Sequence, residues 1–153
     1  MTYKHSMPPR RRQPRVAQAA VALSPEGPLL SGMVKGKKAS DLEEVFARAL
    51  DKTDSVQWWQ FRNHYGAPMG QVGSIELDFL VYTGTSYPVQ IDGDWIHRSA
   101  EAKAHDLLQD ARLNAILQPR GAMPVERIPG YKLQDGREAS QDKADRIVEE
   151  MFV

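Results

Sequence analysis

The 153-residue sequence contains no cysteine, which excludes disulfide bonds and zinc sites built on cysteine. It also lacks any apolar run close to the roughly 18 residues that a membrane span needs, so we expect no membrane partner. The segment RRRQPR followed by VAQAAVAL imitates an export signal, but its apolar part is short and contains Gln18. We therefore expect a protein that is not secreted and that works in a reducing compartment such as the cytoplasm.

The formal net charge is zero, but the charges are unevenly distributed. Residues 1–38 hold eight lysines and arginines and a single acid, Glu26, whereas residues 39–153 hold twelve basic and nineteen acidic residues. The first 38 residues also contain five of the ten prolines. We interpret residues 1–39 as a flexible or extended basic arm and residues 40–153 as one folded α/β domain.

A basic arm is typical of proteins that contact phosphate backbones, so DNA is the expected partner. The side chains expected to make these contacts are Arg10, Arg11, Arg12, Arg15, Lys35, Lys37 and Lys38. Three other interpretations stay open: a solubilising tail, a tail that docks on its own acidic body, and an arm that joins a protein assembly.

The hydrophobic pattern of the folded part predicts the element order α-β-β-β-α-β-α. Ser40 and Glu43 form a capping-box pattern that begins a helix at about residues 41–50. Three strands are predicted at 56–62, 75–82 and 87–92, a second helix at 99–118, a strand at 123–128 and a closing helix at 140–152. In the second helix, we expect the apolar side chains to face the core. These are Ala104, Leu107, Leu108, Ala111, Ala115 and Ile116.

The most informative stretch is SIELDFLVYTGTSYPVQIDGDWIH at residues 74–97. A strand period of two places Gln90 and Asp92 on one face of their strand, and Asp78 can join them if the two strands pair. Carboxylate oxygens are the ligands that Mg²⁺ or Mn²⁺ prefers, and such an ion activates water. His97 follows and is a candidate acid or base. The alternative is structural, because Asp92-Gly93 is also an ordinary turn signal.

The order of short motifs resembles the PD-(D/E)XK nuclease superfamily, in particular the very-short-patch-repair endonucleases and their small bacterial and phage relatives. The motifs are Glu43 in SDLEEVFARAL, Asp78 in LDFLV, Asp92 and His97 in PVQIDGDWIH, the helix HDLLQDARLNAIL, and Arg127 in PVERI. The resemblance covers about residues 40–153. It implies a restriction-endonuclease-like αβββαβ core with a mixed sheet, extended here by a C-terminal helix and the N-terminal basic arm.

The resemblance also implies roles for individual residues. Asp78 would be the principal metal ligand, Asp92 would take the final catalytic position, and Glu43 would join them from its helix. Gln90 stands where the family usually has its second carboxylate, and no lysine follows it in the strand. Two functions follow as expectations: a metal-dependent DNA endonuclease of bacterial or phage origin, or a catalytically inactive nuclease fold that serves as a structural or adaptor subunit.

Overall fold

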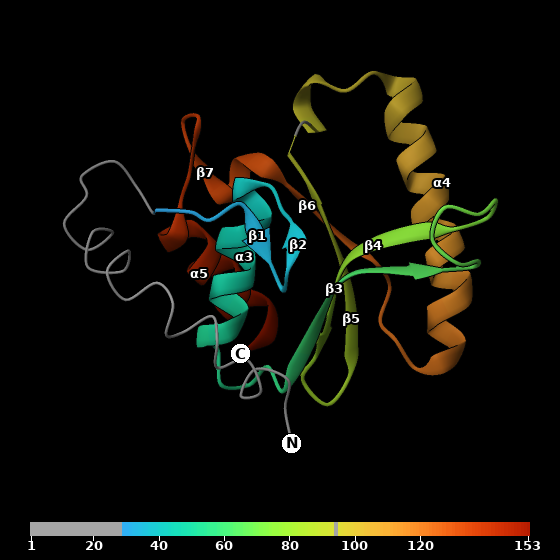
Figure 1. The fold of residues 1–153 in the computed structure, drawn as a ribbon, viewed down its shortest axis with the longest axis horizontal. Helices are drawn as coiled ribbons and strands as arrows, with labels where there is room; N and C mark the ends of the chain where they lie inside the picture. Colours follow the sequence, from blue (N-terminus) through green and yellow to red (C-terminus); the bar gives the residue numbers. More distant parts are fainter. Residues whose placement is uncertain (1–28, 94) are drawn as a thin grey trace. The chain divides into compact units, whose positions relative to one another are not determined.

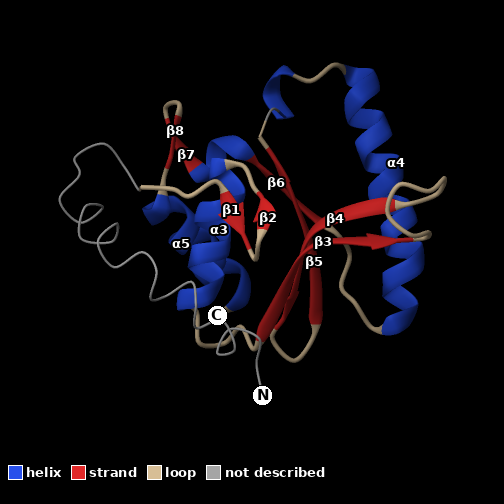
Figure 2. Cartoon of the chain, viewed as in Figure 1, coloured by secondary structure: helices blue, strands red, loops and turns tan. Residues whose placement is uncertain are grey.

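The computed structural model describes residues 29–93 and 95–153, which form a mixed α/β protein with a four-stranded mixed sheet and three α-helices (Figures 1 and 2). The predicted DNA contacts Arg10, Arg11, Arg12 and Arg15 lie outside the described residues. The described residues fold as two compact units, one made of residues 29–58 together with Tyr131–Val153, and the other of Trp59–Gly130. No helix in the described ranges is long and apolar enough to cross a membrane.

The first unit is built around two packed helices, α3 (Asp41–Lys52) and α5 (Gln141–Phe152). The capping box that begins α3 forms as predicted, with Ser40 Oγ accepting from the Glu43 backbone N–H and the Glu43 carboxylate accepting from the Ser40 N–H. Polar contacts also join the two helices: Gln141 Nε2 donates to the Val45 carbonyl at 2.9 Å. Helix α3 is therefore fixed at its start by its own cap and along its length by α5.

Two short hairpins complete this unit, and the sequence pattern predicts neither. Strands β1 (Met33–Val34) and β2 (Lys37–Lys38) pair antiparallel, as do β7 (Gln134–Asp135) and β8 (Glu138–Ala139). The interpretation of residues 1–39 as a flexible arm is therefore wrong for residues 31–38.

A buried carboxylate holds the start of the first hairpin. Glu44 is 3% exposed, although its position beside Glu43 suggests an exposed residue. Its oxygens accept hydrogen bonds from the Ser31 N–H and hydroxyl and from the Gly32 N–H, and they pair with Arg48 at 2.9 Å. The pairing with Arg48 is expected from their spacing, but the backbone contacts explain why the carboxylate is buried.

The second unit holds the four-stranded sheet, in the order β3 (Trp58–Tyr65), β4 (Ile75–Tyr82), β5 (Ser86–Asp92) and β6 (Glu126–Pro129). Strands β4 and β5 are antiparallel, and β5 and β6 are parallel. The predicted alternation of β4 is confirmed, because every second residue from Ile75 to Val81 is buried. On the same face Phe79 contacts the rings of Trp59 and Phe61, at centroid distances of 5.8 and 5.1 Å.

Helix α4 (Ala100–Leu117) begins after Ser99, whose side chain caps it by accepting a hydrogen bond from the Ala102 N–H. The predicted buried face of this helix is wrong except at Ile116, which is partly buried and packs against the apolar cluster. Asp110, Leu113 and Leu117 are buried, whereas Leu107 and Leu108 are 56% and 62% exposed. Leu113 and Leu117 pack with Ile75 and Leu77 of β4 in one apolar cluster. The apolar pattern of α4 covers most of its circumference, so periodicity alone does not identify the side that packs.

The connection between β3 and β4 requires glycine at its first position. Gly66 has φ +83°, and a Cβ atom at this residue would lie 2.5 Å from the carbonyl oxygen of Gly73. Gly70 has almost the same φ, +84°, but the space around it is open. Gly66 therefore meets a close backbone approach as well as a left-handed conformation.

Candidate active site on the four-stranded sheet

Beyond the last backbone pair of β4 and β5, side-chain hydrogen bonds hold the two strands together. The register pairs Phe79 with Val89. Gln90 follows Val89 on β5, and Asp78 precedes Phe79 on β4. Gln90 Oε1 accepts a hydrogen bond from the Asp78 N–H at 2.8 Å, and Gln90 Nε2 donates one to the Glu76 carbonyl at 3.1 Å. In return, the Asp78 carboxylate accepts from the Ile91 N–H at 2.8 Å. Asp78 and Gln90 are therefore brought together, as the sequence predicted.

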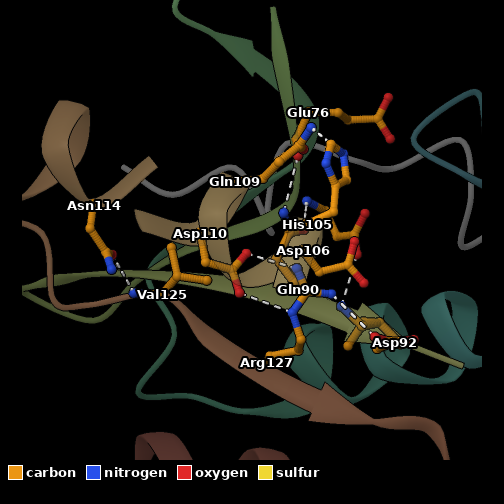
Figure 3. Close-up of polar contacts among 12 residues, drawn as sticks. Glu76, Gln90, Asp92, His105, Asp106, Gln109, Asp110, Asn114, Val125 and Arg127 are labelled. Carbon is orange, nitrogen blue, oxygen red and sulfur yellow. Dashed lines mark hydrogen bonds and ion pairs between the residues drawn. The ribbon is translucent and has the colours of Figure 1, made fainter. Parts of the chain in front are cut away.

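The register also places Arg127 and Asp92 on this side of the sheet. Gln90 is the neighbour of Arg127 in the parallel β5–β6 pair, and Asp92 lies two residues beyond Gln90 on the same face of β5. Gln90 and Asp92 are both buried, at 7% and 4% exposure. We call Asp78, Gln90, Asp92 and Arg127 the polar face of the sheet. Figure 3 labels three of these residues, Gln90, Asp92 and Arg127.

Arg127 links the polar face to helix α4. Its guanidinium makes a two-point contact with Asp110, from Nε to Oδ2 at 2.9 Å and from Nη2 to Oδ1 at 2.7 Å. Its Nη1 lies 3.4 Å from Asp92 Oδ2. The three side chains are 17%, 10% and 3% exposed for Arg127, Asp110 and Asp92. A fork-to-fork contact of this kind fixes both partners, so α4 is held over β6 by a buried ion pair.

The electrostatic environment keeps Arg127 charged. Burial of the guanidinium lowers its pKa, but the hydrogen bond and charge of Asp110, together with the charges of Asp106 and Asp92, outweigh burial. The net pKa of Arg127 is raised above its ordinary value. The polar face therefore carries a positive charge next to Asp92 at neutral pH.

Two further ion-pair groups flank the polar face. On α4, Asp106 lies one turn before Asp110 and pairs with Arg98 at 2.8 Å. On the other side, Glu76 of β4 pairs with Arg62 at 3.5 Å and His64 at 3.3 Å, both from β3. Polar side chains thus run across all four strands.

The remaining predicted site residues belong to other elements of the structure. His97 is exposed in a 3₁₀ turn at Trp95–His97, beyond the end of β5. Glu43 belongs to the other compact unit and caps α3 with its carboxylate. Of the predicted basic contacts, Lys35, Lys37 and Lys38 belong to the β1–β2 hairpin, where Lys37 and Lys38 are exposed.

The donors on the polar face fit a hard divalent cation in kind. Mg²⁺ takes oxygen ligands, commonly one or two carboxylates completed by water and substrate phosphate, and Asp78 and Asp92 supply two carboxylates. Within residues 29–93 and 95–153, no three histidine, aspartate or glutamate side chains are grouped closely enough to bind a metal by themselves. Water and phosphate would therefore have to complete the coordination of an ion held by Asp78 and Asp92.

Sequence reasoning missed the role of Asp110. The sequence motifs assign no role to Asp110, but its 10% exposed side chain is the direct partner of Arg127. A usable signal was present, because Asp106, Asp110, Leu113 and Leu117 are spaced as one helical face. Two acids aligned with two leucines indicate a face that packs on a basic residue.

Comparisons with protein-family models, with curated proteins and with solved structures found no match to this chain.

Proposed function

We propose that this protein is a metal-dependent phosphodiesterase of the nuclease type, with its site on the polar face of the sheet. The observation that carries the proposal is the contact of Asp78 with Gln90 at the end of the β4–β5 pairing, with Asp92 on the same face of β5 beside the half-buried Arg127. The order αβββαβ from α3 to β6 supports a restriction-endonuclease-like core. DNA is the proposed substrate because of the basic N-terminal region.

Each residue of the polar face has a distinct role in this proposal. Asp78 and Asp92 would hold Mg²⁺ or Mn²⁺, which when bound lowers the pKa of water and stabilises charge on a phosphodiester. Gln90 orients Asp78, since its amide fixes the backbone of β4 on both sides of residue 77. Arg127 supplies the positive charge that the family resemblance assigns to a lysine in this region, and it remains 17% exposed.

Two observations favour the alternative, a catalytically inactive nuclease fold that acts as a structural or adaptor subunit. Both polar groups of the Gln90 amide are engaged by the β4 backbone. Asp92 also lies beside Arg127 at 3.4 Å. These contacts stabilise the sheet without a metal ion, so a purely structural role is enough to account for the polar face.

Cleavage of supercoiled, linear and branched DNA in Mg²⁺ or Mn²⁺ separates the two functions. The decisive variant is Asp78→Asn, because its side-chain oxygen still accepts from the Ile91 N–H while the charge is lost. We expect it to lose more than the roughly 10–100-fold that removal of an outer-shell partner costs. The matched control is Asp54→Asn at an exposed position of the other unit, which should cleave as the unaltered protein does.

Three outcomes decide between the proposals. Cleavage that Asp78→Asn abolishes supports the enzyme. Equal cleavage by both proteins refutes this site. Absence of cleavage on every DNA, together with a melting temperature that Mg²⁺ does not raise, favours the inactive subunit, because a bound ion would stabilise the folded state.

The basic N-terminal region has a separate test. Counterion release makes the logarithm of DNA affinity fall with the logarithm of salt concentration, with a slope of about 0.9 per phosphate contact. Changing Arg10, Arg11, Arg12 and Arg15 together to glutamine in the full chain should lower that slope by about 3–4. An unchanged slope would show that these arginines do not contact phosphate.

A further inference from the structure

The outer face of α4 exposes an apolar stripe. Leu107 and Leu108 are 56% and 62% exposed, and four alanines on the same side of the helix are also exposed, namely Ala100, Ala104, Ala111 and Ala115. At 3.6 residues per turn these six side chains form a single band opposite the buried Asp110, Leu113 and Leu117. We call them the α4 stripe. Contiguous exposed apolar surface of this kind marks interaction sites in soluble proteins.

The α4 stripe has the same pattern in both directions along the helix. Its centre falls between Leu107 and Leu108, Ala104 and Ala111 lie at equal distances from it, and so do Ala100 and Ala115. A twofold axis through that centre would place a second, antiparallel α4 with leucine against leucine and alanine against alanine. Such self-complementarity is the property that an interface between two identical chains requires.

Charged residues beside the stripe select the antiparallel arrangement. Glu101 and Arg112 are both exposed and lie on the same flank of the stripe, near its opposite ends. In an antiparallel pair, Glu101 of one copy lies about 3 Å along the axis from Arg112 of the other, and the symmetry repeats the contact. In a parallel pair, Glu101 of one copy would lie 11 positions, or about 16 Å along the axis, from Arg112 of the other, so the two could not pair. Arg112 is available for this contact, since its 3.5 Å approach to the Gly73 carbonyl leaves it exposed.

We propose that the α4 stripe is the interface of a homodimer in which two α4 helices pack antiparallel. The alanines permit close approach of the two helices, the leucines fill the centre, and two Glu101–Arg112 pairs fix the direction. An 18-residue helix is about 27 Å long, so this contact belongs to the small, reversible class of interfaces. The dimer should therefore form and dissociate with protein concentration.

Sedimentation of the full chain across a wide range of concentration tests the interface. The unaltered protein should shift from monomer to dimer, and Leu108→Lys should weaken that association at least tenfold. The matched control is Val72→Lys, which changes an exposed apolar residue in a loop away from α4 and should dimerise normally. An unaltered protein that stays monomeric, or a Leu108→Lys variant that dimerises as well as the control, overturns the proposal.

Charge exchange tests the direction of packing. Glu101→Arg and Arg112→Glu should each weaken the dimer, and the double variant should restore it, because exchange regenerates both pairs. A double variant weaker than both single variants would refute the antiparallel arrangement.

The absence of native cysteine offers a third measurement. A thiol introduced by Leu108→Cys should react with a labelling reagent more slowly as protein concentration rises. Slow labelling at every concentration would mean that another segment of the same chain covers the stripe, and would overturn the dimer.

Discussion

The substitution Gln90→Glu tests the structural reasoning most directly, because it exchanges one NH₂ group for an oxygen in a buried position. The acceptor contact with the Asp78 N–H at 2.8 Å survives. The hydrogen bond from Gln90 Nε2 to the Glu76 carbonyl, 3.1 Å long, is lost, because a carboxylate oxygen then faces the carbonyl oxygen. Since Gln90 is only 7% exposed, water cannot readily replace the lost donor.

The expected cost follows from two opposing effects. An unsatisfied buried acceptor costs about 1–3 kcal/mol, and an ionised carboxylate in the same place costs more. Arg127 is the neighbour of Gln90 on β6 and offsets part of this, but its guanidinium already contacts Asp110 and Asp92. We therefore expect Gln90→Glu to lower the free energy of unfolding by about 1–3 kcal/mol at neutral pH.

The loss should depend on pH with a definite sign. Burial and the facing carbonyl raise the pKa of the introduced carboxyl above its value in the unfolded chain, about 4.3. This carboxyl destabilises the folded protein most at a pH above its folded pKa, where it is ionised, and the cost of ionisation disappears below its unfolded pKa. In that acidic range the protonated carboxyl can also donate a hydrogen bond to the Glu76 carbonyl. The stability difference between the two proteins should therefore narrow as pH falls from 8 toward 4.

Urea unfolding of both proteins at several pH values provides the measurement, read from midpoints at constant slope. The matched control is Gln71→Glu, which adds the same charge at an exposed loop position and should change stability by less than about 0.5 kcal/mol. A variant as stable as the unaltered protein at pH 8, or a difference that widens on acidification, would refute the assigned hydrogen bonds.

The same variant also reports on metal binding. A carboxylate at position 90 would add a third negative oxygen ligand beside Asp78 and Asp92, as in the family that the sequence resembles. If the polar face binds Mg²⁺, the ion should raise the melting temperature of Gln90→Glu more than that of the unaltered protein. Equal melting temperatures with and without Mg²⁺ in both proteins would contradict a metal site there.

Two further predictions concern the fold around the site. Arg127→Met should lower the free energy of unfolding by about 3–5 kcal/mol in urea titrations, because Asp110 and Asp92 stay buried without their cation. The pKa of Arg127 is raised in the folded protein, so its contribution to the free energy of unfolding is complete below the unfolded pKa and is lost only above the folded pKa. The difference in free energy of unfolding between the two proteins should therefore be constant from about pH 7 to pH 10. A loss below 1 kcal/mol would mean that the ion pairs are dispensable. Gly66→Ala should lower the melting temperature more than Gly70→Ala, since both variants place a side chain on a left-handed residue but only Gly66 meets a backbone oxygen; equal losses would contradict the close approach.

The element order was predictable because local signals agreed with the packing. The Ser40–Glu43 capping box and the alternation from Ile75 to Val81 each depend on neighbours in sequence, and both are present in the structure. The placement of Asp78 against Gln90 followed from strand periodicity together with the assumption that the strands pair. Local chemistry was therefore sufficient for the core of the candidate site.

The predictions from sequence were wrong where tertiary contacts, and not the local hydrophobic pattern, determine which residues are buried. The buried face of α4 was misassigned because the helix offers two faces, one with leucines at 107 and 108 and one with Asp110 between apolar turns. Burial of Asp110 is favourable only when Arg127 is present 17 residues away in the sequence, and the helical pattern does not identify which basic residue is the partner. The β1–β2 hairpin was missed for the same reason, since Glu44 holds its start from a helix.

The charges of the polar face, together with that of Asp110 on α4, give a reason for Gln90 to be an amide. Asp78, Asp92 and Asp110 bring three formal negative charges and Arg127 brings one positive charge, so the group retains two negative charges. One divalent cation would neutralise that remainder, whereas a carboxylate at position 90 would leave an unbalanced charge in a buried place. Gln90 is thus compatible with a metal-binding site as well as with a structural one.

If the ion is required for neutrality, DNA binding by the unaltered protein should strengthen on addition of Ca²⁺, a hard cation with the same charge and oxygen preference, and Asp78→Asn should reduce that gain. Binding that is indifferent to Ca²⁺ would remove the electrostatic argument for a metal ion on the polar face.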